Sequence, residues 1–187
     1  MDLRELVKSV DKDIGRDKDA LVYRARSIAA ELLEPYLLFH TKIVVQLVRT
    51  LGGDRIDTAA AWLHDIGRVV SGKGHREIGE VWAREWLKAF ELTEEERCRI
   101  LDGIKNHGSK CVPTTETGMR LKLADALAMF DEGWAYMVAT YFKETGRSQE
   151  GINEFQKKWV VVEEMGTAKQ KERCKQVLEK VLSMLRE

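Results

Sequence analysis

The sequence predicts an all-α protein that folds as a single helical bundle of roughly seven to nine helices. Two observations carry this prediction. Nearly every stretch of periodic hydrophobicity has apolar residues three and four positions apart, and no stretch alternates as a half-buried strand would. Proline, glycine and capping-box residues also divide the chain into pieces of helical length. With 187 residues the chain can bury a good core, and we expect one domain over residues 1–187.

Three helices are expected in the N-terminal third. Residues 17–33 carry one apolar face at helical intervals. The second helix begins near Pro35, which is well tolerated in a first turn, and stops at the glycine pair at residues 52–53. The third follows Asp57, a plausible N-cap, and runs to residues 64–65. Its apolar residues lie nearly all round, which predicts a buried helix.

The middle of the chain also has clear start signals. The glycine-containing residues 71–74 form a flexible break, after which His75 opens a helix. Thr93 is followed by three glutamates in the arrangement of a capping box, so a helix should begin at Thr93. After Pro113, a further helix surrounds Asp125 with apolar neighbours.

Three more helices are expected beyond residue 131. The first two span about residues 134–143 and about residues 150–164, and each ends near a glycine. The last begins at a capping box formed by Thr167 and Gln170. Its apolar stripe could also serve a homodimer and contains Val177, Val181 and Leu185.

Composition narrows the class of protein. Lys+Arg and Asp+Glu are both 31, so the net charge is zero, which argues against a broad nucleic-acid-binding surface. The N-terminus lacks the apolar stretch of a signal peptide, and no segment approaches a membrane-spanning length. The three cysteines are far apart and odd in number, which is typical of reduced thiols. We therefore expect a cytoplasmic protein that binds neither membrane nor nucleic acid.

Every histidine of the chain falls where it could converge on one site with two aspartates. The candidate ligands are His40, His64, Asp65, His75, His107 and Asp125. Imidazole and carboxylate groups are the usual ligands of Zn, Fe, Mn, Co and Ni. Six such groups are too many for one tetrahedral structural metal and enough for a two-metal hydrolytic centre. A buried carboxylate such as Asp125 needs a cation or hydrogen-bond donors, and a metal ion would satisfy it.

The order and spacing of these residues resemble the HD-domain superfamily of metal-dependent phosphohydrolases. The resemblance covers roughly residues 35–131 and includes the flanking segments at residues 63–68 and 123–127. The helix at residues 17–33 and the helices at residues 132–187 lie outside it and are expected to pack on this core. The resemblance implies the all-α bundle that the periodicity predicts independently.

The resemblance also implies roles for individual residues. Four of them match the ligands common to the superfamily, which hold one divalent metal: His40, His64, Asp65 and Asp125. His75 and His107 match the additional histidines of two-metal members, in which Asp65 would bridge the ions. We therefore expect one or two divalent ions, chosen from Fe, Mn, Co, Ni, Zn and Mg.

The expected reaction is hydrolysis of a phosphoester of a nucleotide or a related small metabolite, either a monoester or a diester. Metal ions lower the pKa of a bound water, and the resulting hydroxide attacks phosphorus. Asp65 is expected to be catalytic as well as a ligand, and the metals together with a nearby cation should offset the charge on the phosphoryl oxygens. Arg68 is the first candidate because guanidinium suits phosphate, although many family members have lysine there. Lys110 is the second candidate, and Lys73 or Arg76 is a weaker third.

Two other functions fit the same ligand set. A few members of the superfamily are mixed-valent diiron oxygenases, and the six ligands alone do not distinguish them from hydrolases. The protein could also be a non-catalytic regulator that binds a metal or a nucleotide and presents its C-terminal helices to a partner. The intact ligand set argues against this last reading, since a degenerate site would be expected to have lost ligands.

Overall fold

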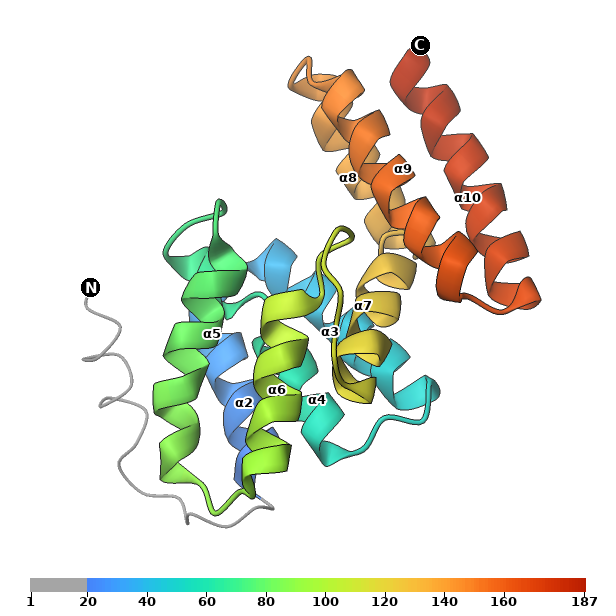
Figure 1. The fold of residues 1–187 in the computed structure, drawn as a ribbon. Coiled ribbons are helices and arrows are strands. Elements are labelled where there is room, and N and C mark those ends of the chain that lie inside the picture. The colour runs from blue at the N-terminus through green and yellow to red at the C-terminus, as the bar shows by residue number, and fades with distance from the viewer. Residues whose placement is uncertain (1–19) are drawn as a thin grey trace.

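The computed structural model describes residues 20–187, which form nine α-helices and two short 3₁₀ helices with no strand in that range (Figure 1). The all-α prediction is confirmed. Residues 17–19 of the first expected helix lie outside the described part. The α-helices are α2 (Ala20–Leu32), α3 (Pro35–Thr50), α4 (Arg55–Leu63), α5 (His75–Trp86), α6 (Glu94–Asn106), α7 (Glu116–Ala128), α8 (Glu132–Glu144), α9 (Ser148–Met165) and α10 (Ala168–Arg186), and the 3₁₀ helices are η1 (Ile66–Val69) and η2 (Leu87–Ala89).

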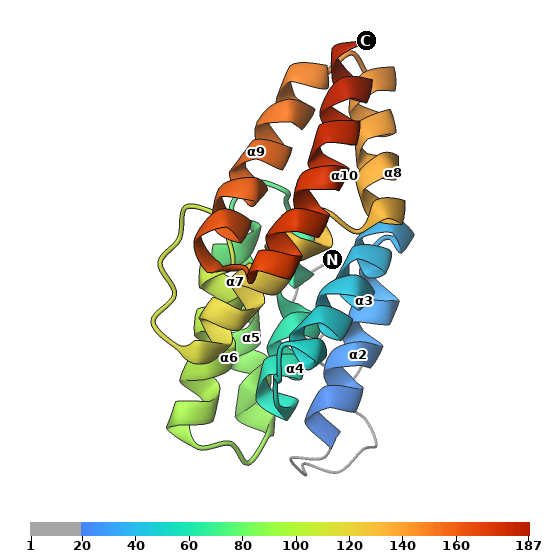
Figure 2. The same cartoon turned by 90° about the vertical axis from the view of Figure 1, so that its right-hand side faces the viewer.

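The helices form two groups that meet at α7 (Figures 1 and 2). We call α2–α7 the core bundle and α8–α10 the arm. The buried apolar side chains fall into two matching clusters: Leu121 and Ala124 of α7 belong to that of the core bundle, and Ala126 and Leu127 to that of the arm. Asp125 thus lies at the junction of the two groups. α2 packs against α4, and α9 packs against α7.

The predicted helix starts at Thr93 and Thr167 are confirmed. The Thr93 hydroxyl accepts from the backbone N–H of Glu96 at 3.2 Å, and the Glu96 carboxylate accepts from the backbone N–H of Thr93 at 2.8 Å. The same reciprocal pair joins Thr167 and Gln170. Each box satisfies donors that the first turn of a helix leaves without partners. The two arm helices before Thr167 start and end within two residues of their expected positions.

The predicted N-cap of α4 was wrong. Asp54 is the N-cap, and its carboxylate accepts from the backbone N–H groups of Ile56 and Asp57 at 2.8 and 2.9 Å. Asp57 is the third residue of the helix and closes a capping box by accepting from the backbone N–H of Asp54 at 3.0 Å. It is only 2% exposed, because it also binds side chains of α6 and α7, namely Arg99, Thr117 and Arg120.

The apolar stripe of α10 is buried inside the arm. Val177, Val181 and Leu185 are at most 4% exposed and pack in the arm's own cluster. The stripe is therefore not available to a second copy of the chain, and the homodimer stays an untested prediction. None of the helices in residues 20–187 is long and apolar enough to cross a membrane.

Candidate metal centre and substrate cleft

The structure brings all six predicted ligands to one place where five helices meet. His40 comes from α3 and Asp125 from α7, while the other four lie at helix ends. Neighbouring imidazole rings are 5.0–5.6 Å apart between centroids along the series from His40 through His64 and His107 to His75. His75 is partly exposed, and the other five are buried. Because four ligands lie at helix ends, several helices can bring their termini to one spot.

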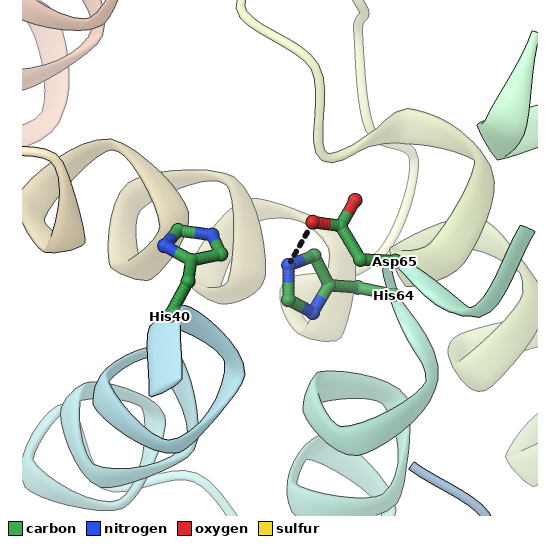
Figure 3. Close-up of side chains that lie close together, drawn as sticks. All are labelled: His40, His64 and Asp65. Atoms are coloured by element: carbon green, nitrogen blue, oxygen red, sulfur yellow. Dashed lines mark ion pairs between the residues drawn. The ribbon is translucent and has the colours of Figure 1, made fainter. Parts of the chain in front are cut away.

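The ligand atoms form two overlapping triads. One contains His40, His64 and Asp65, and the other contains Asp65, His75 and His107; in each, the potential ligand atoms lie within 4.8 Å of one another. Figure 3 shows the first triad, with Asp65 facing the His64 ring. One oxygen of Asp65, Oδ2, lies 3.6 Å from His64 Nε2, whereas Oδ1 lies 3.3 Å from His75 Nε2 and 3.8 Å from His107 Nε2. Asp65 thus offers Oδ2 to the first triad and Oδ1 to the second.

The position of His75 depends on Gly67. A Cβ atom at Gly67 would lie 1.9 Å from the backbone oxygen of His75, so only glycine lets the start of α5 pack against η1. This contact fixes the start of α5 beside η1, across the loop at residues 71–74.

Three of the histidines are oriented by the main chain. The Nδ1 atoms of His64, His75 and His107 lie 2.8–3.0 Å from the carbonyl oxygen three residues earlier. A carbonyl only accepts, so Nδ1 carries the hydrogen and Nε2 carries a free lone pair. The Nε2 atoms of His64 and His75 are buried and have no hydrogen-bond partner among the described residues. A metal ion would supply the missing partner, and a backbone carbonyl at the other ring nitrogen is typical of metal-bound histidine.

The protonation states also suit metal binding. Burial lowers the pKa of His64 and His75 and, with the neighbouring His64, lowers that of His107 to about 3. Burial alone would raise the pKa of Asp65, but His64 and Arg68 outweigh it and hold that pKa well below its usual range. His64, His75 and His107 are therefore neutral and Asp65 is ionised at neutral pH, as a divalent ion requires.

Asp125 differs from the other ligands because both of its oxygens already have partners. Oδ1 lies 3.1 Å from His40 Nε2, and Oδ2 accepts a hydrogen bond from the ammonium group of Lys158. Burial would raise the pKa of Asp125, but Lys158 and the bond from His40 hold it well below its usual range. Sequence reasoning missed Lys158, since nothing in the pattern of a lysine on α9 marks it as a partner of α7.

The two cations favoured from the sequence lie at the same site. Arg68 Nε is 2.7 Å from Asp65 Oδ1, and the Arg68 side chain is 36% exposed. Lys110 is exposed and lines the cleft over the ligands. Of the weaker candidates, Arg76 lines the cleft and donates to Cys111 Sγ at 3.0 Å, whereas Lys73 is not among the lining residues.

The cleft has a volume of about 590 Å³ and two chemically different walls. The core bundle supplies the metal ligands on its floor. The arm supplies an apolar strip on α8, in which Trp134, Val138 and Phe142 follow one another at four-residue spacing, and the Trp134 ring lies 5.0 Å from that of His40. Five described cations line the cleft: Arg68, Arg76, Lys110, Lys157 and Lys158. Such a cleft suits a small anion with an apolar or aromatic part.

Comparison with known proteins gave one family and one similar structure. Residues 37–129 match the family model of the HD domain. The chain is similar to the crystal structure of a predicted HD superfamily hydrolase from an uncultured Thermotogales bacterium, with a TM-score of 0.59 and 20% identity. That alignment covers 100% of this chain and 96% of the other, so the likeness in fold extends over the arm. A search of curated proteins found no match. The match over residues 37–129 identifies an HD domain in this chain.

Proposed function

We propose that this protein is a metal-dependent phosphohydrolase that cleaves a phosphoester of a nucleotide or a related small metabolite. The observation that carries the proposal is the pair of histidine triads sharing Asp65 on the floor of a cationic cleft. The protein of the similar crystal structure is a predicted HD superfamily hydrolase, which agrees with this activity. Localisation in the cytoplasm remains part of the proposal.

The donor set supports two divalent ions. His40, His64, Asp65 and Asp125 would hold one ion, and Asp65, His75 and His107 would hold the other. Ions bound there supply a water of lowered pKa and polarise the phosphoryl oxygens.

The chain's own residues would bind and orient the substrate. Arg68 stands beside Asp65 with about a third of its side chain exposed to the cleft, so its remaining N–H groups can reach a phosphoryl oxygen. Lys110 and Arg76 line the same cleft and add positive charge. Trp134 and Phe142 offer aromatic faces to a base or another apolar group.

The test is metal-dependent ester hydrolysis, measured as free phosphate from monoesters and as nucleoside monophosphate from cyclic nucleotides. Protein stripped with a chelator would be reloaded separately with Mn, Co, Ni, Zn, Mg or Fe and assayed on nucleoside monophosphates, cyclic nucleotides and nitrophenyl phosphate. Asp65→Asn keeps the size of the side chain and should lose both metal and activity. The matched control is Asp131→Asn, which changes an aspartate whose carboxylate caps α8 outside the cleft. Absence of hydrolysis of every ester by metal-loaded protein would refute the proposal.

The number of ions has its own test. Metal content of the purified protein should be two equivalents, and His75→Ala or His107→Ala should reduce it to one. Loading with iron under anaerobic conditions addresses the diiron alternative, because a mixed-valent electron paramagnetic resonance signal that responds to substrate would favour an oxygenase. The five cations of the cleft favour the hydrolase, since they suit a phosphate group.

A further inference from the structure

Lys158 is a residue of the arm that reaches into the ligand set of the core bundle. It lies on α9, beyond residues 37–129 that match the HD domain. Its ammonium group binds Asp125 Oδ2, and its side chain is 17% exposed where it lines the cleft. A lysine placed in this way connects the arm directly to the chemistry of the core bundle.

The charges around the ligands are balanced without any metal ion. The two carboxylates each contact one cation, Arg68 at Asp65 and Lys158 at Asp125. Two divalent ions would add four positive charges, so a loaded site strongly favours an anionic substrate. To bind Asp125, a metal ion must compete with Lys158, because both cations would interact with the lone pairs of Asp125 Oδ2.

A lysine that leaves Asp125 has the cleft in front of it. Lys158 already lines that space, together with Arg68 and Lys110 from the core bundle. The ammonium group has three N–H donors on a flexible stem, so a small rotation exchanges one oxygen partner for another. The oxygens of a phosphoryl group held over the metal centre would replace the carboxylate oxygen that the metal ion takes.

We propose that Lys158 is a phosphate-binding residue contributed by the arm, which rests on Asp125 until a metal ion takes that carboxylate. This inference rests on the proposed function, since it assumes a phosphate ligand over the ions. The phosphate-binding role can be distinguished from that of a purely structural ion pair. Loss of the lysine should leave metal binding as strong or stronger, while weakening phosphate binding.

The test separates these two affinities in the full-length protein. Wild type, Lys158→Met and Lys158→Arg would be compared with Lys180→Met, an exposed lysine of α10 in the same arm and away from the cleft. Mn²⁺ affinity would be measured by competition with a chelating dye, and the affinity of inorganic phosphate for Mn²⁺-saturated protein by calorimetry. Should Lys158→Met fail to fold by circular dichroism, Lys158→Gln takes its place, because it keeps a donor for Asp125.

We expect Lys158→Met to bind Mn²⁺ at least as tightly as wild type and to bind phosphate about tenfold or more weakly. Lys158→Arg should keep most of the phosphate affinity, and Lys180→Met should match wild type in both. Unchanged phosphate affinity in Lys158→Met would overturn the inference, as would a loss of Mn²⁺ affinity, since the lysine would then support the ligands.

Phosphate binding needs no turnover, so the two proposals fail separately. A protein that releases phosphate from esters while Lys158→Met binds phosphate normally contradicts only the role of Lys158. A protein that hydrolyses no ester, yet loses phosphate affinity in Lys158→Met, contradicts only the proposed reaction.

Discussion

The substitution Gly67→Ala tests how the second triad is built. The new Cβ atom would lie 1.9 Å from the backbone oxygen of His75 and 2.8 Å from the backbone nitrogen of Gly79, whereas real Cβ contacts stay beyond 3.0 Å. The start of α5 must therefore move away by about 1.1 Å, the difference between 1.9 and 3.0 Å. Both obstacles are backbone atoms, so no side-chain rotation can relieve the clash.

The displacement acts on stability and on metal binding. Overpacking of this kind costs about 1–3 kcal/mol, and in a protein of this size each kcal/mol lowers Tm by about 2–4 °C. His75 Nε2 now lies 3.3 Å from Asp65 Oδ1, so a shift of this size takes it away from its triad. We expect Gly67→Ala to lose one metal equivalent of two, because the triad with His40 and His64 does not involve α5.

The assay is metal content by mass spectrometry together with thermal unfolding. Gly72→Ala is the control: it lies in the adjacent loop, and a Cβ atom there meets nothing within 4 Å. It should keep both metal equivalents and the wild-type Tm. A Gly67→Ala protein with two equivalents and an unchanged Tm would show that α5 is free to adjust, and that its packing against η1 does not position His75.

Three further predictions concern the site and the fold. Arg68→Ala should lower kcat/KM for a phosphomonoester about 10²-fold with metal content unchanged; an unaltered rate would remove Arg68 from phosphate binding. Asp57→Ala should lower the free energy of unfolding in urea by about 2–4 kcal/mol, because Arg99 and Arg120 lose a buried partner; a loss below that of an exposed aspartate would contradict this. Metal-free protein should lose stability as the pH falls from 6.5, the ordinary pKa of histidine, toward the pKa of about 3 of His107, because the unfolded chain takes up the proton first. In His107→Gln, the free energy of unfolding in urea should depend less on pH across this range. The same pH dependence in both proteins would contradict the assignment.

The sequence predicted the helices well where the signals were local. Capping boxes at Thr93 and Thr167 involve residues three positions apart, so they can be recognised without knowing the fold. The start of α4 was placed too late because Asp54 and Asp57 both suit an N-cap, and only the buried contacts of Asp57 with α6 and α7 show which one begins the helix. Periodicity predicts which face of a helix is buried, but not the helix that covers it. The expectation that residues 132–187 lie outside the core came from the family resemblance and not from the periodicity.

The site was predictable to the extent that its residues are rare. The chain has four histidines, and all of them lie at the cleft or directly beneath it. Lysine is abundant on every helix surface, and the contact of Lys158 with Asp125 depends on how α9 packs on α7. The cations of the arm therefore became visible only with the tertiary arrangement.

Because backbone carbonyls rather than side chains fix the rings of His64, His75 and His107, no neighbouring residue can be exchanged to alter their tautomers. Engineers who wish to change the preferred metal of this centre would have to replace a ligand itself or shift a helix terminus. The same restriction would act during evolution, where drift at surrounding positions could reshape the substrate wall while leaving the imidazole donors untouched.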